Sequence, residues 1–330
     1  MPINEDYILE KLLAKVSNIE SAVAPQLPDI NFYNKCREYI QLLKAEGRTN
    51  TAICYNRSLQ RFINYSKTTD LRAINRQLIN DFFEYISQTV SADAAKAYVI
   101  DIRALFRHIT KFMSNAPNPF VGLNLRRKLY RIHRYITVQE LRRLAEAQNL
   151  PPLAQFARDA FIISFSLCGI NICDLFTIKP PEDNILHYYR QKTTRRRDDQ
   201  AEQSIRINST AAQFAARYLA ADGVHWLDWA QRSATERNLL KKINKGLKIC
   251  ANVLNLPPLL STYYARHTFA SIARNELHFD IFDISEALNH KPPSNSIDFV
   301  YIRPDNNKPS EIAAAVCNFI FGSSAAAAAN

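Results

Sequence analysis

Three residues near the carboxyl end of the chain could act together on a phosphate group. Arg266 lies in the segment TYYARHTFAS, His290 ends the segment ALNH, and Tyr301 lies in SIDFVYIRPD. A guanidinium offers paired donors that match phosphate oxygens, and an imidazole donates or accepts a hydrogen bond near neutral pH. A phenol becomes a nucleophile once its proton is removed. The set therefore predicts phosphoryl-transfer chemistry in the stretch from Thr262 to Asp305.

The composition favours a globular protein with a polyanionic partner. The 330 residues suffice for two domains, and 42 Lys and Arg against 31 Asp and Glu give a net charge of +11. A basic surplus of this size favours nucleic acid as the partner. The longest apolar run, Ala160–Ile170, is about half the length of a membrane span. With a polar start and six cysteines that lack metal spacing, we expect a cytoplasmic protein.

The first region that must support this chemistry is helical. Apolar spacing predicts an amphipathic helix in an N-terminal arm, residues 1–28. Its role stays open between packing on its own domain, an oligomer contact and a DNA-contacting arm. Residues 29–115 then read as a four-helix domain with short connections. The expected helices are Phe32–Glu46, Thr49 or Asn50 to Ser66, Asn75–Thr89 and Ala92–Phe112.

A boundary and a basic run follow this domain. The sequence SNAPNP at Ser114–Pro119 is turn chemistry without periodicity. The run LRRKLYRIHR that follows carries five Lys and Arg and no acid. It is either a solvated charged segment or a basic linker that lies along DNA. We take residues 116–134 as this linker, and its DNA-binding candidates are Arg126, Arg127, Lys128, Arg131 and Arg134.

The second region, residues 135–321, is expected to be mostly helical with one small sheet. Thr137 and Glu140 form a capping box at its first helix, and the apolar segment Pro151–Leu167 predicts a buried helix. The tail, residues 322–330, has low complexity and is expected to be disordered. The chain as a whole is therefore predicted to be mainly α with a small β-sheet, an α+β fold.

The small sheet is expected to be a hairpin. Its strands are predicted at Asn184–Thr193 and Gln203–Ile207. The connection TRRRDDQAE is strongly charged and exposed, and Arg195 and Arg196 within it are further DNA-binding candidates.

The ordered fragments resemble a known family. ARHTFA, then ALNH, then a tyrosine followed by an aliphatic residue, with QKT on an upstream strand, look like a tyrosine recombinase or phage-type integrase. The resemblance is closest to integrases of mobile elements in Bacteroidetes-like bacteria. It implies that residues 29–115 are a SAM-like core-binding domain and that residues 135–321 are the catalytic domain. QKT alone is a weak signal, whereas the ordered set Lys, Arg, His, Tyr is strong.

The resemblance also implies roles for single residues. Arg266 matches the arginine that clamps the scissile phosphate, and His290 matches the residue that hydrogen-bonds it. Lys192 matches the lysine that protonates the leaving 5′ oxygen. Tyr301 matches the nucleophile that forms a 3′-phosphotyrosyl bond. That bond conserves the energy of the phosphodiester, so the resemblance implies neither a metal nor another cofactor.

Two positions depart from the pattern of the family. Tyr263 stands where the family has the histidine of its HxxR motif. Asn171 in SLCGINICDL stands where the first arginine is expected, and Cys168 occupies the alternative position for that arginine. Asp174 still matches the acidic residue of the same motif. An arginine from elsewhere could take the missing role, and the candidates are Arg190, Arg195 and Arg303.

Two functions remain open from the sequence. The leading hypothesis is site-specific DNA recombination by a homotetramer on paired double-stranded sites, for which the resemblance also allows an accessory DNA-bending factor. In the family the last helix docks on a neighbour, and Glu311–Phe321 is apolar enough to do so. The alternative is a site-specific DNA-binding or architectural protein that has lost catalysis. A metal-dependent nuclease needs spaced carboxylates that converge on a metal. The acidic residues offer no such framework beyond the surface pair Asp198 and Asp199, so this function is rejected.

Overall fold

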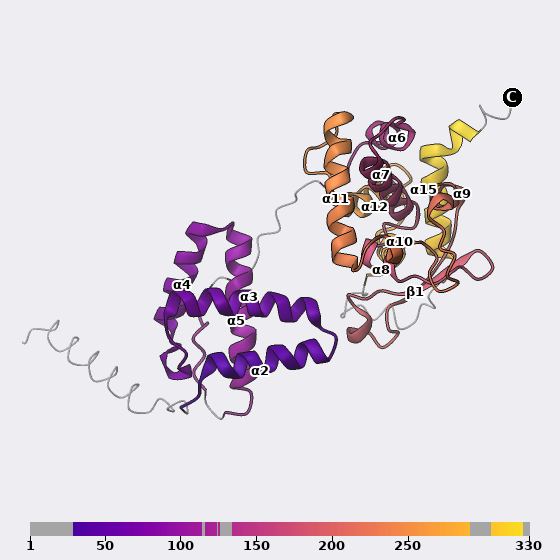
Figure 1. Cartoon of the computed structure of the whole chain (residues 1–330). Helices are drawn as coiled ribbons and strands as arrows, with labels where there is room; N and C mark the ends of the chain where they lie inside the picture. The colour runs from indigo at the N-terminus through magenta and orange to yellow at the C-terminus, as the bar shows by residue number, and fades with distance from the viewer. Residues whose placement is uncertain (1–28, 114–115, 124, 126–133, 291–304, 326–330) are drawn as a thin grey trace, which may run out of the picture. The chain divides into compact units, whose positions relative to one another are not determined.

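The computed structural model describes residues 29–113, 116–123, 125, 134–290 and 305–325 (Figure 1). The chain divides into two compact units, Met1–Arg131 and Ile132–Asn330. The N-terminal arm, residues 124 and 126–133 of the basic linker, and Tyr301 lie outside the described residues. Within the described residues no helix has the length and apolarity to cross a membrane.

The first unit is a bundle of helices around an apolar core. Its helices begin where side chains can cap them: Asn31, Asn75 and Ser91 each accept a hydrogen bond from the backbone of the following turn. The core is built on aromatic side chains such as Phe62 and Phe82, whose rings meet edge to face at 5.1 Å. The elements are α2 (Phe32–Ala45), α3 (Thr49–Ser66), η1 (Leu71–Ala73), α4 (Arg76–Thr89) and α5 (Ala92–Ile109).

The four predicted helices of this unit are present, with differences at their ends. The N-cap position of α3 is Arg48 rather than Thr49 or Asn50. Helix α5 ends at Ile109 rather than at Phe112. Phe120 and Leu125, which lie in the segment expected to link the domains, are buried in the core of this unit.

The second unit is organised around α7, the buried helix predicted at Pro151–Leu167. It packs against α9, α11, α12 and α15, and Figure 1 shows α7 and α12 between α11 and α15. A Cβ at Gly246 of α11 would lie 2.4 Å from the carbonyl oxygen of Leu153, so this glycine lets α11 lie directly against α7.

The capping box of Thr137 and Glu140 is formed at the start of this unit. The helices before the sheet are α6 (Val138–Glu146), α7 (Pro152–Ser166) and α8 (Ile172–Phe176). Those after it are α9 (Ser209–Ala215), η3 (Ala216–Tyr218), α10 (Trp229–Arg232), α11 (Glu236–Val253), α12 (Thr262–Asn275), α13 (Ile281–Ala287) and α15 (Lys308–Ala325).

The two strands form an antiparallel hairpin that is shorter than predicted. Strand β1 (Ile185–Tyr189) pairs with β2 (Glu202–Arg206), with Tyr189 opposite Glu202. The first strand ends well before Thr193 because the chain turns at Arg190, whose carbonyl accepts hydrogen bonds from the backbone N–H groups of Thr193 and Thr194. The connection contains the short helix η2 (Thr194–Arg196). The described residues are thus mainly α with a small β-sheet, as predicted.

The last helix packs on its own unit. Ile312, Val316 and Ile320 of α15 are buried in the same core as α7. The side chain of Arg142 donates to the carbonyls of Phe319 and Ile320. Within one chain the segment therefore packs in cis, and its docking on a neighbouring protomer stays a prediction. The helix also continues to Ala325, so the first residues of the predicted disordered tail are helical.

Candidate active site

Arg266 is held inside the second unit by two backbone carbonyls. It lies on α12 with 7% of its surface exposed. Its Nη1 donates to the carbonyl of Gly169 at 3.2 Å, and its Nη2 donates to the carbonyl of Leu288. Gly169 has a φ of +65°, and a Cβ there would lie 2.4 Å from the Cα of Arg266. Only glycine fits this close approach without strain, so the glycine of SLCGIN shapes the arginine site.

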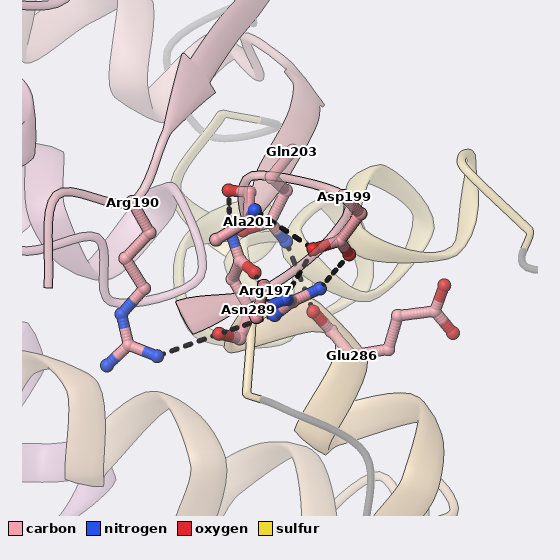
Figure 2. Close-up of polar contacts among 7 residues, drawn as sticks. All are labelled: Arg190, Arg197, Asp199, Ala201, Gln203, Glu286 and Asn289. Atoms are coloured by element: carbon pink, nitrogen blue, oxygen red, sulfur yellow. Dashed lines mark hydrogen bonds and ion pairs between the residues drawn. The ribbon is translucent and has the colours of Figure 1, made fainter. Parts of the chain in front are cut away.

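A second buried arginine lies beside it. Arg190, at the end of β1, is 8% exposed, and its Nη1 donates to the carbonyl of Asn289 at 2.7 Å (Figure 2). Arg266 and Arg190 therefore bind the consecutive carbonyls of Leu288 and Asn289. Sequence reasoning named Arg190 only as one of three candidates, because nothing in the sequence shows that its side chain turns inward.

The two guanidiniums create a surplus of buried positive charge. Burial, and then the charge of Arg190, lowers the pKa of Arg266 to about 10. Asp174 lies in the same surroundings, where burial raises the pKa of its carboxyl while Arg190 and Arg266 act in the opposite direction. Neither arginine forms an ion pair with a carboxylate among the described residues. A site of this charge is suited to an anion.

His290 and Lys192 complete the positive surroundings. The pKa of His290 is lowered to about 4. The largest cause is partial burial of the imidazole, and the positive charges of Arg266, Arg190 and Lys192 add to it. His290 is therefore neutral near neutral pH and can donate one hydrogen bond. Lys192 is exposed and lies in the turn after β1 rather than at the end of the strand. The predicted residues Arg266, His290 and Lys192 are thus brought together from three separate segments.

The two departures from the family pattern also lie near this site. Tyr263 is 46% exposed on α12, and its ring meets that of His267 edge to face at 4.7 Å. Arg134 lies over the same tyrosine ring, 5.8 Å from its centre. Asn171 is the N-cap residue of α8, and its side chain acts to lower the pKa of the nearby carboxyl of Asp174. Asn171 therefore contributes no positive charge to the site.

A hydrogen-bonded network joins the hairpin to the ALNH turn. Gln203 of β2 donates to the carbonyls of Glu286 and Ala287 at 3.2 and 2.9 Å. Asn289 donates from Nδ2 to the carbonyl of Ala201 at 2.8 Å, and its Oδ1 accepts from Arg197 at 2.8 Å (Figure 2). This network fixes the turn after β1 relative to His290. Sequence reasoning missed it, since its members are ordinary polar residues far apart in the chain.

The predicted DNA-binding residues are only partly described. Arg195 is exposed in η2, and Asp199 of the acidic pair forms an ion pair with Arg197. The residues that lie outside the described positions are Arg126, Arg127, Lys128 and Arg131, and the side chain of Arg196 is also outside them.

A basic face on α11 was missed by the sequence reasoning. Four exposed side chains recur at helical spacing along one side of this helix: Arg237, Lys241, Lys245 and Lys248. The signal was present in the sequence as basic residues three or four positions apart. Such a face is suited to phosphate groups.

The comparisons with known proteins agree with this architecture. Residues 31–120 match the phage integrase SAM-like domain family. The fold is similar to that of a lambda integrase tetramer bound to a Holliday junction, at 14% identity and a TM-score of 0.59 over 89% of each chain. A lambda integrase dimer bound to a COC′ core site is 17% identical, with a TM-score of 0.57 over 85% of this chain and 79% of that one.

A transposon protein shows the same likeness. The Tn1549 transposon integrase in complex with circular intermediate DNA is 14% identical, with a TM-score of 0.52 over 81% of this chain and 97% of that one. No curated protein sequence matches the chain. The chain has the fold of the tyrosine recombinases. Its residues 31–120 match the phage integrase SAM-like domain, as the resemblance of its motifs predicted.

Proposed function

We propose that this chain is a site-specific tyrosine recombinase that breaks and rejoins double-stranded DNA. The observation that carries the proposal is the convergence of Arg266, His290 and Lys192 on one site with surplus positive charge. These three residues come from distant segments, in the order that the family resemblance assigns to them. Solved integrases of the same fold are bound to DNA, which supports DNA as the substrate.

The proposed chemistry is a transesterification. The phenolic oxygen of Tyr301 loses its proton to solvent and forms a bond to phosphorus, while the bond between phosphorus and the 5′ oxygen breaks. Lys192 gives a proton to that oxygen, because an alkoxide is a poor leaving group. Arg266 and the neutral His290 donate hydrogen bonds to the phosphate oxygens, where negative charge develops. Rejoining reverses these steps with a new 5′ hydroxyl, so integration, excision and inversion share one mechanism.

The proposed partners are a DNA duplex and further copies of the chain. The net charge of +11 and the basic face of α11 suit a duplex. The basic linker and Arg195 are proposed to add phosphate contacts. One related structure is a tetramer on a Holliday junction, and we propose a homotetramer on paired sites. The place of action is the DNA of a bacterial cytoplasm, with an accessory DNA-bending factor as a further proposed partner.

A second function is favoured by one observation. Asn171 stands at the position that the resemblance assigns to the first arginine, and an amide brings no positive charge to the site. A recombinase fold that lacks one arginine of its phosphate site could bind DNA specifically without cleaving it. This alternative predicts a sequence-specific complex without a covalent bond.

A nicked substrate separates the two functions. A duplex bound by the full chain would first be selected from a random pool, and then nicked so that cleavage releases a short fragment and traps the covalent intermediate. We expect a protein–DNA adduct that survives denaturation and is lost in Tyr301→Phe. Specific binding by the wild-type chain without an adduct would instead support the architectural function.

A further inference from the structure

We propose that Arg190 is the second phosphate-binding arginine of this site and takes the role that the residue at position 171 has in the family. The ligand is a phosphodiester oxygen of DNA, and this identity rests on the proposed function. The anion site itself does not depend on that function and is tested separately below.

The buried positive charge beside His290 is not balanced by a carboxylate among the residues that the structure describes. Among the described residues of the second unit, three arginines are buried: Arg158, Arg190 and Arg266. Arg158 forms an ion pair with the buried carboxylate of Asp159. Arg190 and Arg266 have no carboxylate within ion-pair distance in the described part of the chain. Two like charges held together away from water are unfavourable unless an anion balances them.

The directions of the two side chains are the second argument. Arg190 and Arg266 bind consecutive carbonyls, those of Asn289 and Leu288, so both guanidiniums reach the turn that carries His290. Arg190 uses Nη1 for this contact. Its Nε is buried and has no hydrogen-bond partner among the described residues. A buried donor without a partner is unfavourable, so a bound oxygen that reached it would relieve an existing deficit.

The anchoring of Arg190 is the third argument. The next residue, Gln191, donates its backbone N–H to the carboxylate of Asp174 at 3.0 Å. Its side chain donates to the carbonyl of Cys173 at 3.0 Å and to Thr177 at 3.1 Å. The end of β1 is therefore fastened to α8 and the residue that follows it. Asn171 is the N-cap residue of this helix, so the residue next to Arg190 is anchored to the element at whose start the family carries its first arginine.

The anion site can be tested with inorganic phosphate alone. Isothermal titration calorimetry on the full chain is expected to show saturable phosphate binding that is weakened at least ten-fold in both Arg190→Gln and Arg266→Gln. Arg206→Gln, which removes an exposed arginine from the same hairpin, is the matched control and should bind as the wild type does. Wild-type affinity in Arg190→Gln, or no saturable binding by the wild-type chain, would overturn the inference.

The role in cleavage is tested by the rate of adduct formation on the nicked duplex. Arg190→Gln should slow it about 10²- to 10³-fold, the effect of removing one donor to developing negative charge, while duplex affinity stays close to that of wild type. Adding Asn171→Arg to Arg190→Gln should restore part of the rate, which a variant that merely misfolds would not show. A wild-type rate in Arg190→Gln would contradict the inference even if recombination itself is confirmed.

The two proposals can fail separately. If the wild-type chain forms no adduct, the proposed function fails, and phosphate binding lost in Arg190→Gln still supports the two-arginine site. If the adduct forms equally well with and without Arg190, the function stands and the inference fails. A thermal melt of each variant, followed by tryptophan fluorescence, confirms that the second unit is folded before either result is used.

Discussion

The second unit contains two buried charged clusters that are built in opposite ways. In the first, Arg158 and Asp159 form an ion pair, and Asp159 also accepts from the hydroxyl of Tyr218 at 2.6 Å. In the second, Arg190 and Arg266 donate to backbone carbonyls, and neither forms an ion pair with the nearby carboxylate of Asp174 in the described part of the chain. The first cluster balances its charge internally, and the second keeps a positive surplus.

This difference indicates which buried charge supports the fold and which supports function. A balanced pair needs nothing from outside, and breaking it leaves an isolated charge in the core. A surplus of positive charge weakens the fold until an anion arrives, so its presence points to a ligand. The first unit sharpens the contrast, because its only buried polar side chain among the described residues is Ser58. The charged side chains described in that unit are half-buried or exposed.

The largest expected effect is on stability at the balanced cluster. Asp159→Asn should lower the free energy of unfolding of the second unit by about 3–5 kcal/mol, since Arg158 is left as an unpaired buried charge. Trp226 and Trp229, the two tryptophans of the chain, both lie in this unit, so urea denaturation followed by tryptophan fluorescence reports on it. Arg217→Gln is the control, because this partner of Asp159 is 60% exposed. Equal loss in both variants would contradict the assignment.

The next effect is on activity at the unbalanced cluster. Arg266→Gln should reduce the rate of adduct formation about 10²- to 10³-fold, equivalent to about 3–4 kcal/mol of transition-state stabilisation. Its free energy of unfolding should stay the same or rise, because one of two like buried charges is removed. A destabilisation as large as that of Asp159→Asn would show that the second cluster is structural as well.

A smaller effect is expected at the glycine beside Arg266. Gly169→Ala places a Cβ at 2.4 Å from the Cα of Arg266, at a residue whose φ is +65°. Forced overpacking of this kind costs about 1–3 kcal/mol, and it should also displace the guanidinium and slow cleavage. Gly223→Ala is a matched control, since its φ is also positive but no atom lies within 4 Å of the new Cβ. Equal stability of the two variants would rule out the close contact.

The smallest effect is a shift in proton binding. His290 should titrate near pH 4 rather than near its ordinary value of 6.5. Between these two pH values the imidazole is protonated in the unfolded chain but not in the folded chain. The contribution of His290 to the free energy of unfolding is therefore complete above pH 6.5 and is lost as the pH falls from 6.5 towards 4. NMR of the imidazole C–H signals, assigned with His290→Asn, measures the pKa. Arg190→Gln should raise the pKa of His290. An ordinary pKa of His290 in both the wild type and Arg190→Gln would show that the arginines do not act on this imidazole.

Most helices could be predicted from the sequence, because local residue patterns determine where a helix forms and begins. Amphipathic spacing and capping residues such as Ser91 and Thr137 mark helices that the structure contains. Strand ends were less predictable: β1 stops at Tyr189 because the turn at Arg190 draws two backbone N–H groups to one carbonyl. The packing of α15 on its own unit could not be read either, because an apolar face fits a neighbour as well as its own core.

Only those residues of the site that belong to sequence motifs could be predicted from the sequence. The motifs that contain Lys192, Arg266 and His290 predicted a common site, and the structure brings these three residues together. The inward turn of Arg190, its contact with Asn289 and the pairing of Gln203 with the ALNH turn depend on long-range packing. Such contacts join ordinary polar residues about 80 to 100 positions apart, and no local spacing encodes them.

The central claim is that this chain joins DNA to Tyr301, and one measurement tests it directly. The adduct formed on the nicked duplex would be trimmed with nuclease and protease and mapped by tandem mass spectrometry. We predict a single nucleotide-modified site at Tyr301, joined through a 3′ phosphate and absent from Tyr301→Phe. A nucleotide on any other residue, or a specific complex that yields no modified peptide, would contradict the account.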